Sequence, residues 1–203
     1  MKPAGAPPHL STSRLLLRPR TLEDLNANVA MDLDPHVYTS YDIHFYVRRS
    51  AANPRALRKA IKSEITSGGS PRGALWVVQW RDQPSFLGLI ELFPWTAPPS
   101  TAISFRLVKS AWRQGIATEA AAAVLDFAFG VMNLPTIIAL VNPENHPSQR
   151  VVTKIGMRLD GEVHLAQNPA LTPFETCHAW IKRSSKFIVY RLDRSDYRQT
   201  SVT

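Results

Sequence analysis

This 203-residue sequence is poor in several features, and each absence excludes a class of protein. Its single cysteine, Cys177, excludes an internal disulfide and a cysteine-based metal cluster, which fits a reducing compartment. No apolar run reaches the length of a transmembrane helix, and residues 1–8 lack the apolar segment of a secretory signal. Hydrophobic residues make up 44% of the chain, which excludes disorder throughout. The sequence therefore predicts a cytoplasmic globular protein with no metal site and no membrane contact.

Acidic residues are also few. The chain has 16 Asp and Glu against 24 Lys and Arg, which gives a formal net charge of +8. This balance favours anionic partners, among which are nucleic acid, an acidic protein and a phosphate-rich cofactor. Zinc-finger spacing, heptads and an aromatic-basic RNA-binding signature are all missing, so a dedicated nucleic-acid module is not favoured.

The chain is long enough for one domain with a sizeable core. Residues 1–12 are rich in Pro, Ser and Thr and predict a flexible arm, and residues 194–203 predict a polar tail. We expect residues 13–193 to form a single domain, because no repeat or linker divides them. Within it, residues 165–185 are longer than an ordinary loop between strands and are interpreted as an insertion.

Hydrophobic periodicity predicts alternating strands and helices. Strands are expected at residues 14–18, 74–80, 86–93, 103–107, 136–141, 157–163 and 187–192. Helices are expected at residues 22–33 after the capping residue Thr21, after Asn53-Pro54, from Ala120, and at residues 146–155. The fold class is therefore α/β, with a mixed, mostly antiparallel sheet of about seven strands and flanking helices.

The stretch from Ala102 to Phe129 is the centre of this organisation. It contains a strand, a short loop and a helix in immediate succession. The loop, Trp112 to Glu119, has a single glycine at Gly115, where the backbone can approach another group closely. The first turn of the helix has N–H groups without intrahelical partners and carries the positive end of the helix dipole. A loop of this kind is typical of an anion-binding site.

Two blocks of the sequence carry a family resemblance. Gln114 to Ala120, read with Trp112 before it, resembles the G-K-G-Y-A-T-E-A loop of GNAT-fold acyl-CoA N-acyltransferases, and specifically of the ribosomal-protein-alanine acetyltransferase-like branch. Val141 to Val151 and Lys154 to Met157 resemble the V-x-P-x-N-x-x-S-x-R-V and K-L-G-F patterns of that branch. The blocks lie in the order and spacing of the family, within a resemblance covering residues 11–161. It implies a GNAT fold in which two central parallel strands splay apart, with acetyl-CoA as co-substrate.

The resemblance also implies which residues hold the cofactor. The loop would bind the CoA pyrophosphate through Arg113, Gln114, Gly115, Ile116, Ala117 and Thr118. The preceding strand would pair with the pantetheine arm, as an added strand would, through the backbone groups of Phe105, Arg106 and Leu107. Asn145 would contact CoA. For Asn145 and Ser148 a turn or helix-capping role is the alternative, and both roles are compatible.

The catalytic residues of the family are only partly present. The resemblance implies that the serine of the second block lies near the departing sulfur, so Ser148 is the candidate for protonating the thiolate. Many members also place a tyrosine where this chain has Val152, so that acid is missing. The glutamate often found on the central strand is also missing, because the family's E-I-G-Y reads Ala102 to Phe105 here. Glu91, on the neighbouring strand, is the candidate base in its place. Further candidates are His44 and His178.

The acceptor is expected between two aperiodic, aromatic stretches, residues 38–46 and 165–185. They offer Tyr38, Tyr41 and His178 as binding residues, although a homodimer interface is an equal alternative for the insertion. The expected reaction is direct attack by a primary amine on acetyl-CoA in a ternary complex, the amine being a protein or peptide N-terminus or a small molecule. The alternative is a catalytically silent CoA-binding module with a regulatory or assembly role, which the missing glutamate and tyrosine support.

Overall fold

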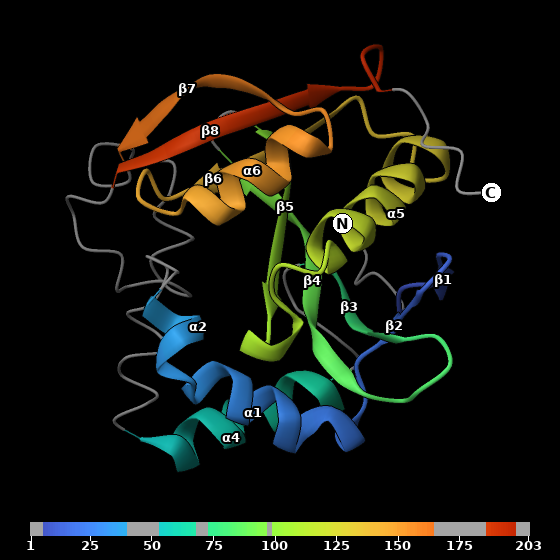
Figure 1. Ribbon diagram of the computed structural model, residues 1–203, viewed down its shortest axis with the longest axis vertical. Helices are drawn as coiled ribbons and strands as arrows, with labels where there is room; N and C mark the ends of the chain where they lie inside the picture. Colours follow the sequence, from blue (N-terminus) through green and yellow to red (C-terminus); the bar gives the residue numbers. More distant parts are fainter. Residues whose placement is uncertain (1–5, 40–52, 68–72, 97–98, 165–185, 198–203) are drawn as a thin grey trace.

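The computed structural model describes residues 6–39, 53–67, 73–96, 99–164 and 186–197 (Figure 1). One eight-stranded sheet has the order β1-β2-β3-β4-β5-β6-β8-β7. Its strands are β1 (Leu10–Ser11), β2 (Leu15–Pro19), β3 (Ala74–Trp80), β4 (Phe86–Thr96), β5 (Pro99–Leu107), β6 (Thr136–Val141), β7 (Arg158–His164) and β8 (Lys186–Asp193).

Helices cover both faces of this sheet. They are α1 (Leu25–Leu33), α2 (Pro35–Thr39), α4 (Pro54–Thr66), α5 (Ile116–Gly130) and α6 (His146–Lys154), with the 3-10 turns η1 (Leu22–Asp24) and η2 (Lys109–Ala111). Figure 1 shows α1, α2 and α4 grouped at the lower end of the view, away from α5 and α6. None of the helices in the described ranges is both long enough and apolar enough to cross a membrane.

The core forms as two layers because successive strand residues point to opposite faces. Trp76 and Val78 of β3 belong to the large buried cluster that contains the apolar face of α5. Leu75 and Val77, which alternate with them along the strand, belong to a second cluster with Met31 of α1. The sheet is therefore buried between α5 on one face and α1 and α2 on the other.

The one parallel pair of the described sheet, β5 and β6, separates after a short contact. Their register contains only Thr101 opposite Ile137 and Ala102 opposite Ile138, whereas β5 continues to Leu107. All other neighbouring strands of the described sheet are antiparallel. The predicted α/β class, the mostly antiparallel sheet and the splayed central pair are confirmed.

Some boundaries differ from those expected. The eighth strand, β1, lies at the end of the expected arm and pairs Leu10 with Leu17 of β2. Helix α5 begins at Ile116, earlier than the expected Ala120. Gly115 has a left-handed φ of 77°, and the helix starts at the residue that follows it. Helix α2, which was not expected, reaches into the aperiodic stretch at residues 38–46, and Pro35 at its first position favours its start.

The beginning of the expected tail packs against α5. The Tyr197 ring lies 4.9 Å from that of Phe129, measured between centroids, and its hydroxyl donates to Asp126 Oδ1 at 2.8 Å. Residues 194–197 therefore belong to the folded unit. The expected insertion at residues 165–185 lies outside the described residues.

Candidate active site

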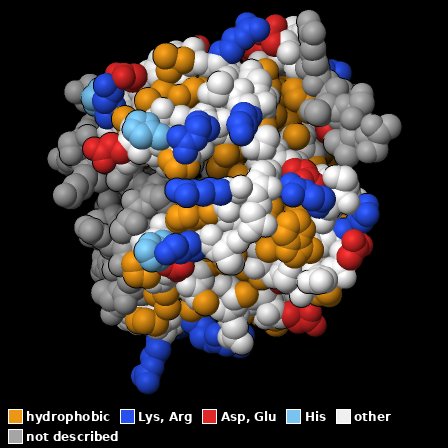
Figure 2. Space-filling view, in the orientation of Figure 1, with side chains coloured by type: hydrophobic (Ala, Val, Ile, Leu, Met, Phe, Trp, Pro, Cys, Tyr) orange, Lys and Arg blue, Asp and Glu red, His pale blue; other side chains and the backbone are white. Residues whose placement is uncertain are grey.

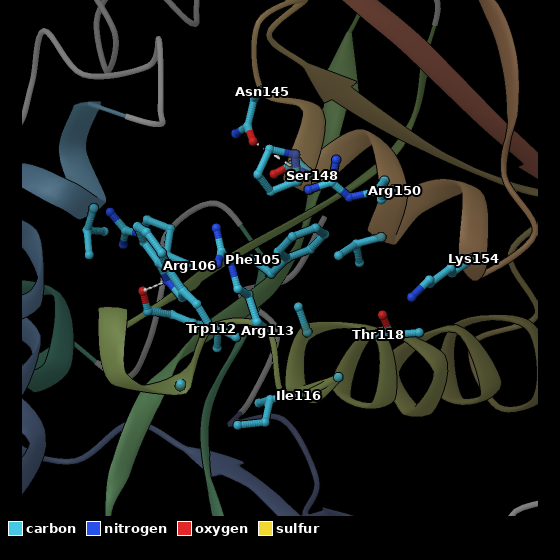
Figure 3. Close-up of a pocket in the computed structure, with 17 residues that line it drawn as sticks. Phe105, Arg106, Trp112, Arg113, Ile116, Thr118, Asn145, Ser148, Arg150 and Lys154 are labelled. Carbon is cyan, nitrogen blue, oxygen red and sulfur yellow. Dashed lines mark hydrogen bonds between the residues drawn. The ribbon is translucent and has the colours of Figure 1, made fainter.

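A pocket of about 360 Å³ lies between the first turn of α5 and the start of α6 (Figure 3). The end of β5 forms a further wall, and Val37 of α2 also lines the pocket. Phe105 and Arg106 both contribute to the lining, although neighbouring strand residues point to opposite faces. The pocket therefore follows the edge of β5 that β6 leaves uncovered, and it can be reached from both faces of the sheet.

The pocket brings together most of the residues expected to bind cofactor, from segments up to 40 positions apart. Those that line it are Phe105, Arg106, Leu107, Arg113, Gly115, Ile116, Ala117, Thr118 and Asn145. Ser148, the expected proton donor, lines the same pocket. Gln114 is not in the lining. Its side chain donates to Ser110 O at 2.6 Å, and its carbonyl accepts from Arg14 Nη2 at 3.1 Å. The loop and the second sequence block thus face each other across one space.

The loop before α5 presents backbone to this pocket. Arg113 and Gly115 have φ values of 60° and 77°, and Gly115 is the N-cap residue, with no side chain to occupy the helix end. The N–H groups of Ile116, Ala117 and Thr118 belong to the first turn, so no intrahelical carbonyl is in place to accept from them. The partial positive charge of the α5 N-terminus is therefore directed at the pocket.

Successive residues of β5 direct their backbone N–H and C=O groups alternately to β4 and to the pocket. Val108 N donates to Leu87 O of β4 at 2.9 Å, and the Arg106 carbonyl also points to β4, since a Cβ built on Gly88 would lie 2.1 Å from it. Phe105 and Leu107 therefore direct their backbone groups to the other edge, which faces the pocket. There Leu107 O accepts a hydrogen bond from Trp112 Nε1 at 2.9 Å. Of the backbone groups expected to pair with pantetheine, those of Phe105 and the Leu107 amide are on the pocket side of β5, and those of Arg106 are on the β4 side.

The side chain of Arg106 lies on the α1 side of the sheet. Its Nη1 lies 3.0 Å from Oδ1 of Asp32, whose other carboxylate oxygen accepts from Asn28 Nδ2 at 3.1 Å. Asp32 is only 5% exposed, and burial raises the pKa of its carboxyl, an effect that the charges of Arg106 and Arg20 oppose. A buried polar cluster thus fixes one wall of the pocket to α1.

At the start of α6, Asn145 is the helix cap. Its Oδ1 accepts from Ser148 N at 3.1 Å, so the capping role that the sequence left open between Asn145 and Ser148 belongs to Asn145. Ser148 is half-buried and its side chain lines the pocket, close to Asn145 in Figure 3. Val152, at the position of the family tyrosine, is fully buried and is absent from the lining.

Basic side chains surround the mouth of the pocket. In Figure 3, Lys154 extends from α6 toward Thr118 of α5, Arg150 lies along α6 on the side of Ser148, and Arg113 lies before the start of α5. All three are exposed, and Figure 2 shows Lys and Arg side chains gathered over α6 and beside the start of α5. Arg150 and Lys154 belong to the second sequence block but were not among the expected site residues, although their spacing of four places them on one helix face. An apolar pocket with a basic mouth suits a ligand with an extended arm and a phosphate-bearing end.

The remaining expected site residues lie elsewhere. Glu91 accepts from Ser104 Oγ at 3.0 Å and is not part of the lining. It stands opposite Ser104, two residues before Arg106, so it shares the α1 side of the sheet with Arg106. The backbone of Tyr38 belongs to α2, but its side chain, like Tyr41, His44 and His178, lies outside the described residues.

In the part of the chain that the structure describes, no group of three or more His, Cys, Asp or Glu side chains is placed to hold a metal ion. The reactive features of the pocket are backbone amides, the hydroxyls of Thr118 and Ser148, and several cations.

Comparison with known proteins gives consistent results. The family model described as "Acetyltransferase (GNAT) domain" matches residues 14–158. A curated relative, the uncharacterized N-acetyltransferase YnaD of Bacillus subtilis, is 29% identical over 153 residues, which cover 75% of this chain and 84% of YnaD. The matched region contains the whole pocket.

Solved structures share the fold. RimJ of Mycobacterium smegmatis in complex with CoA-disulfide is 21% identical, with a TM-score of 0.61, covering 95% of this chain and 88% of RimJ. The ribosomal-protein-S5-alanine acetyltransferase of Vibrio fischeri is 14% identical, with a TM-score of 0.65, covering 95% of this chain and 100% of the Vibrio protein. At these identities the similarity concerns the fold alone.

Proposed function

Because the chain belongs to the acetyltransferase (GNAT) family, we propose that it transfers an acetyl group from acetyl-CoA, bound in this pocket, to a primary amine. Membership of this family identifies the chain as an acetyltransferase. What we propose is the location of the site, the class of acceptor and the mechanism. The observation that carries it is the pocket itself, which joins the amide-rich start of α5, the uncovered edge of β5 and a basic mouth.

In this proposal each part of acetyl-CoA has a counterpart in the pocket. The pyrophosphate would accept hydrogen bonds from the amides at Gly115 to Thr118, where the helix dipole favours an anion. Arg113 would add a positive charge beside it. The pantetheine amides would follow the edge of β5 at Phe105, and Asn145 would contact the arm from the start of α6. Arg150 and Lys154 would face the phosphates at the mouth.

The chemistry requires two proton movements. The amine nitrogen forms a bond to the thioester carbonyl carbon, the carbon–sulfur bond breaks, and no covalent enzyme intermediate is formed. In our proposal Ser148 donates a proton to the departing thiolate, because its hydroxyl lines the pocket. Glu91 takes the proton of the amine through water from the α1 side of the sheet, which the pocket reaches past Arg106.

The acceptor approaches from that same side. We propose a peptide or protein N-terminus or a small amine, contacted by Tyr38, Tyr41 and His178. One neighbour that shares the fold is a ribosomal-protein-S5-alanine acetyltransferase, so a protein acceptor is the first to test. A silent CoA-binding module is the second candidate, favoured by the buried valine at position 152 and the absence of Glu91 from the lining.

Two measurements on the same preparation test the proposal. Acetyl-CoA should raise the melting temperature, because a ligand that binds only the folded state stabilises it by mass action. CoA release should then depend on an added amine, in a panel of peptides with N-terminal Ala or Ser and small primary amines. Binding without release for any amine would favour the silent module, and the absence of any thermal shift would overturn the proposed site.

A further inference from the structure

We propose that Arg14, in the turn between β1 and β2, is a positioning residue that holds the loop before α5 in the shape required by acetyl-CoA. This inference rests on the proposed function, because it concerns the loop to which the pyrophosphate is assigned. Arg14 lies outside the pocket lining, at the start of the segment where the sequence predicted the first strand.

The guanidinium group of Arg14 contacts both sides of the turn at Gly115, Gln114 before it and Glu119 after it. Arg14 Nε donates to Glu119 Oε2 at 2.7 Å, and Nη2 lies 2.6 Å from the same oxygen. Nη2 also donates to Gln114 O at 3.1 Å. Gln114 immediately precedes Gly115, and Glu119 is the fourth residue of α5. The side chain therefore spans the turn from the loop into the helix and fixes both of its sides.

The anchor of this contact is the sheet. The Thr12 hydroxyl donates to Glu119 Oε1 at 2.5 Å and accepts from the amide of the fully buried Leu15 at 2.8 Å. The Arg14 amide also donates to Glu119 Oε1 at 3.2 Å, and the Arg14 carbonyl accepts from Arg81 N at 2.9 Å. The β1–β2 turn is thus attached to the strands below it before it reaches the loop.

The loop has a physical need for such a support. Arg113 and Gly115 both hold left-handed backbone conformations, which a side chain such as that of Arg113 rarely adopts without surrounding contacts. Residues 113–115 are exposed, so packing does little to fix them. Arg14 Nη2 is the nearest atom to a Cβ built on Gly115, at 3.5 Å, which places the guanidinium directly beside the turn.

Arg14 has a second effect, which concerns charge. The carboxylate of Glu119 lies in the first turns of α5, near the amides assigned to the pyrophosphate. Burial alone would raise the pKa of Glu119, but the hydrogen bonds from Thr12 and Arg14 outweigh it and leave the pKa below its ordinary value. Glu119 is therefore ionised at neutral pH, and the positive charge of Arg14 offsets its repulsion of a bound phosphate.

The matched control is Arg18, four residues further along the same segment. Its Nη2 lies 2.7 Å from Asp24 Oδ1, and its Nε donates to Gln79 Oε1 at 2.7 Å, far from the loop in sequence. The Arg18–Asp24 pair is the more buried, with side chains 22% and 5% exposed against 46% and 17% for Arg14 and Glu119. Arg18→Ala should therefore lower the melting temperature more than Arg14→Ala does.

Affinity for acetyl-CoA should follow the opposite order. Loss of charge-assisted hydrogen bonds that hold the loop should raise the Kd of Arg14→Ala by about tenfold or more, while Arg18→Ala stays within about twofold of the wild type. Arg14→Lys, which keeps the charge but cannot bind both Glu119 and Gln114 in a fork, should fall between. Isothermal titration gives the Kd values, and thermal melting gives the stabilities.

Hydrogen exchange of the amides at residues 113–119, measured without ligand, separates this inference from the proposed function. Exchange there should rise in Arg14→Ala and not in Arg18→Ala, whether or not the wild type binds acetyl-CoA. If Arg14→Ala does not fold, Glu119→Gln, which weakens the same contacts, serves in its place. Wild-type exchange and wild-type Kd in the Arg14 variant, or equal losses of affinity in both variants, would overturn the inference.

Discussion

At the scale of one residue, the backbone conformation at position 115 requires glycine, and lack of room for a side chain does not. A Cβ at this position would meet only Arg14 Nη2, at an ordinary contact distance of 3.5 Å. The φ of 77° is the constraint, because an L-residue pays about 1–2 kcal/mol to adopt it. The sequence expectation that Gly115 allows close backbone approach is thus compatible with a conformational reason for the same residue.

Gly115→Ala should therefore lower the free energy of unfolding by about 1 kcal/mol and weaken acetyl-CoA binding. Gly115→Asn should cost less, since Asn tolerates the left-handed region better than other residues with side chains. Gly130→Ala, at the other end of α5 with nothing within 4 Å of its added Cβ, is the control and should leave stability unchanged or slightly raised. Urea unfolding measures all three. Equal effects of Ala and Asn would contradict the conformational explanation.

Variants of Ser148 and Asn145 distinguish a catalytic role from a helix-capping role. Ser148→Ala should lower kcat by about tenfold or more with little change in the KM for acetyl-CoA, because protonation of the thiolate matters chiefly in the transition state. Asn145→Ala should lower stability by about 1 kcal/mol through loss of the cap to Ser148 N. Steady-state kinetics and thermal melting on both variants give the comparison. An unchanged kcat in Ser148→Ala would remove Ser148 from the proposed mechanism.

At the scale of elements, local patterns predicted most of the fold. The bounds of β3 and β6 match the expected strands, and α4 begins where Asn53 and Pro54 indicated, with Asn53 Oδ1 accepting from Ala56 N at 3.0 Å. Strand β1 could not be recognised, because two residues carry no periodicity and their pairing depends on β2. The Arg14–Glu119 contact joins residues 105 positions apart, and no local signal marks it.

Helix α1 is attached to the site by a contact that the sequence did not predict. Asp32→Asn should leave Arg106 without its counter-charge and lower the free energy of unfolding by about 1 kcal/mol, because the Arg106 side chain is 28% exposed and burial already disfavours the charged form of Asp32. The control is Asp82→Asn in the exposed pair Arg81–Asp82, at 3.6 Å, which should change stability by less than about 0.5 kcal/mol. Urea unfolding measures both. Similar small losses would show that the Asp32 contact does not hold α1.

For the molecule as a whole, the distribution of the net charge of +8 has more functional meaning than its size. Exposed Arg113, Arg150 and Lys154 gather where the pocket opens, so part of the excess is placed to attract an anionic ligand. Helix α4 carries an exposed pair of the same residue types at the same spacing, Arg55 and Lys59, outside the pocket lining. Removing the pair from α6 or from α4 changes the net charge by the same amount, so the comparison tests whether the position of the charges matters.

The double variant Arg150→Gln/Lys154→Gln should raise the Kd for acetyl-CoA by about tenfold and make it less dependent on salt, because both charges lie at the mouth assigned to the phosphates. Arg55→Gln/Lys59→Gln removes the same charge from α4 and should leave the Kd and its salt dependence close to those of the wild type. Isothermal titration at about 50 and 300 mM salt supplies the four comparisons. If both double variants weaken binding equally, only the total charge matters, and the assignment of the phosphates to the mouth formed by α6 is wrong.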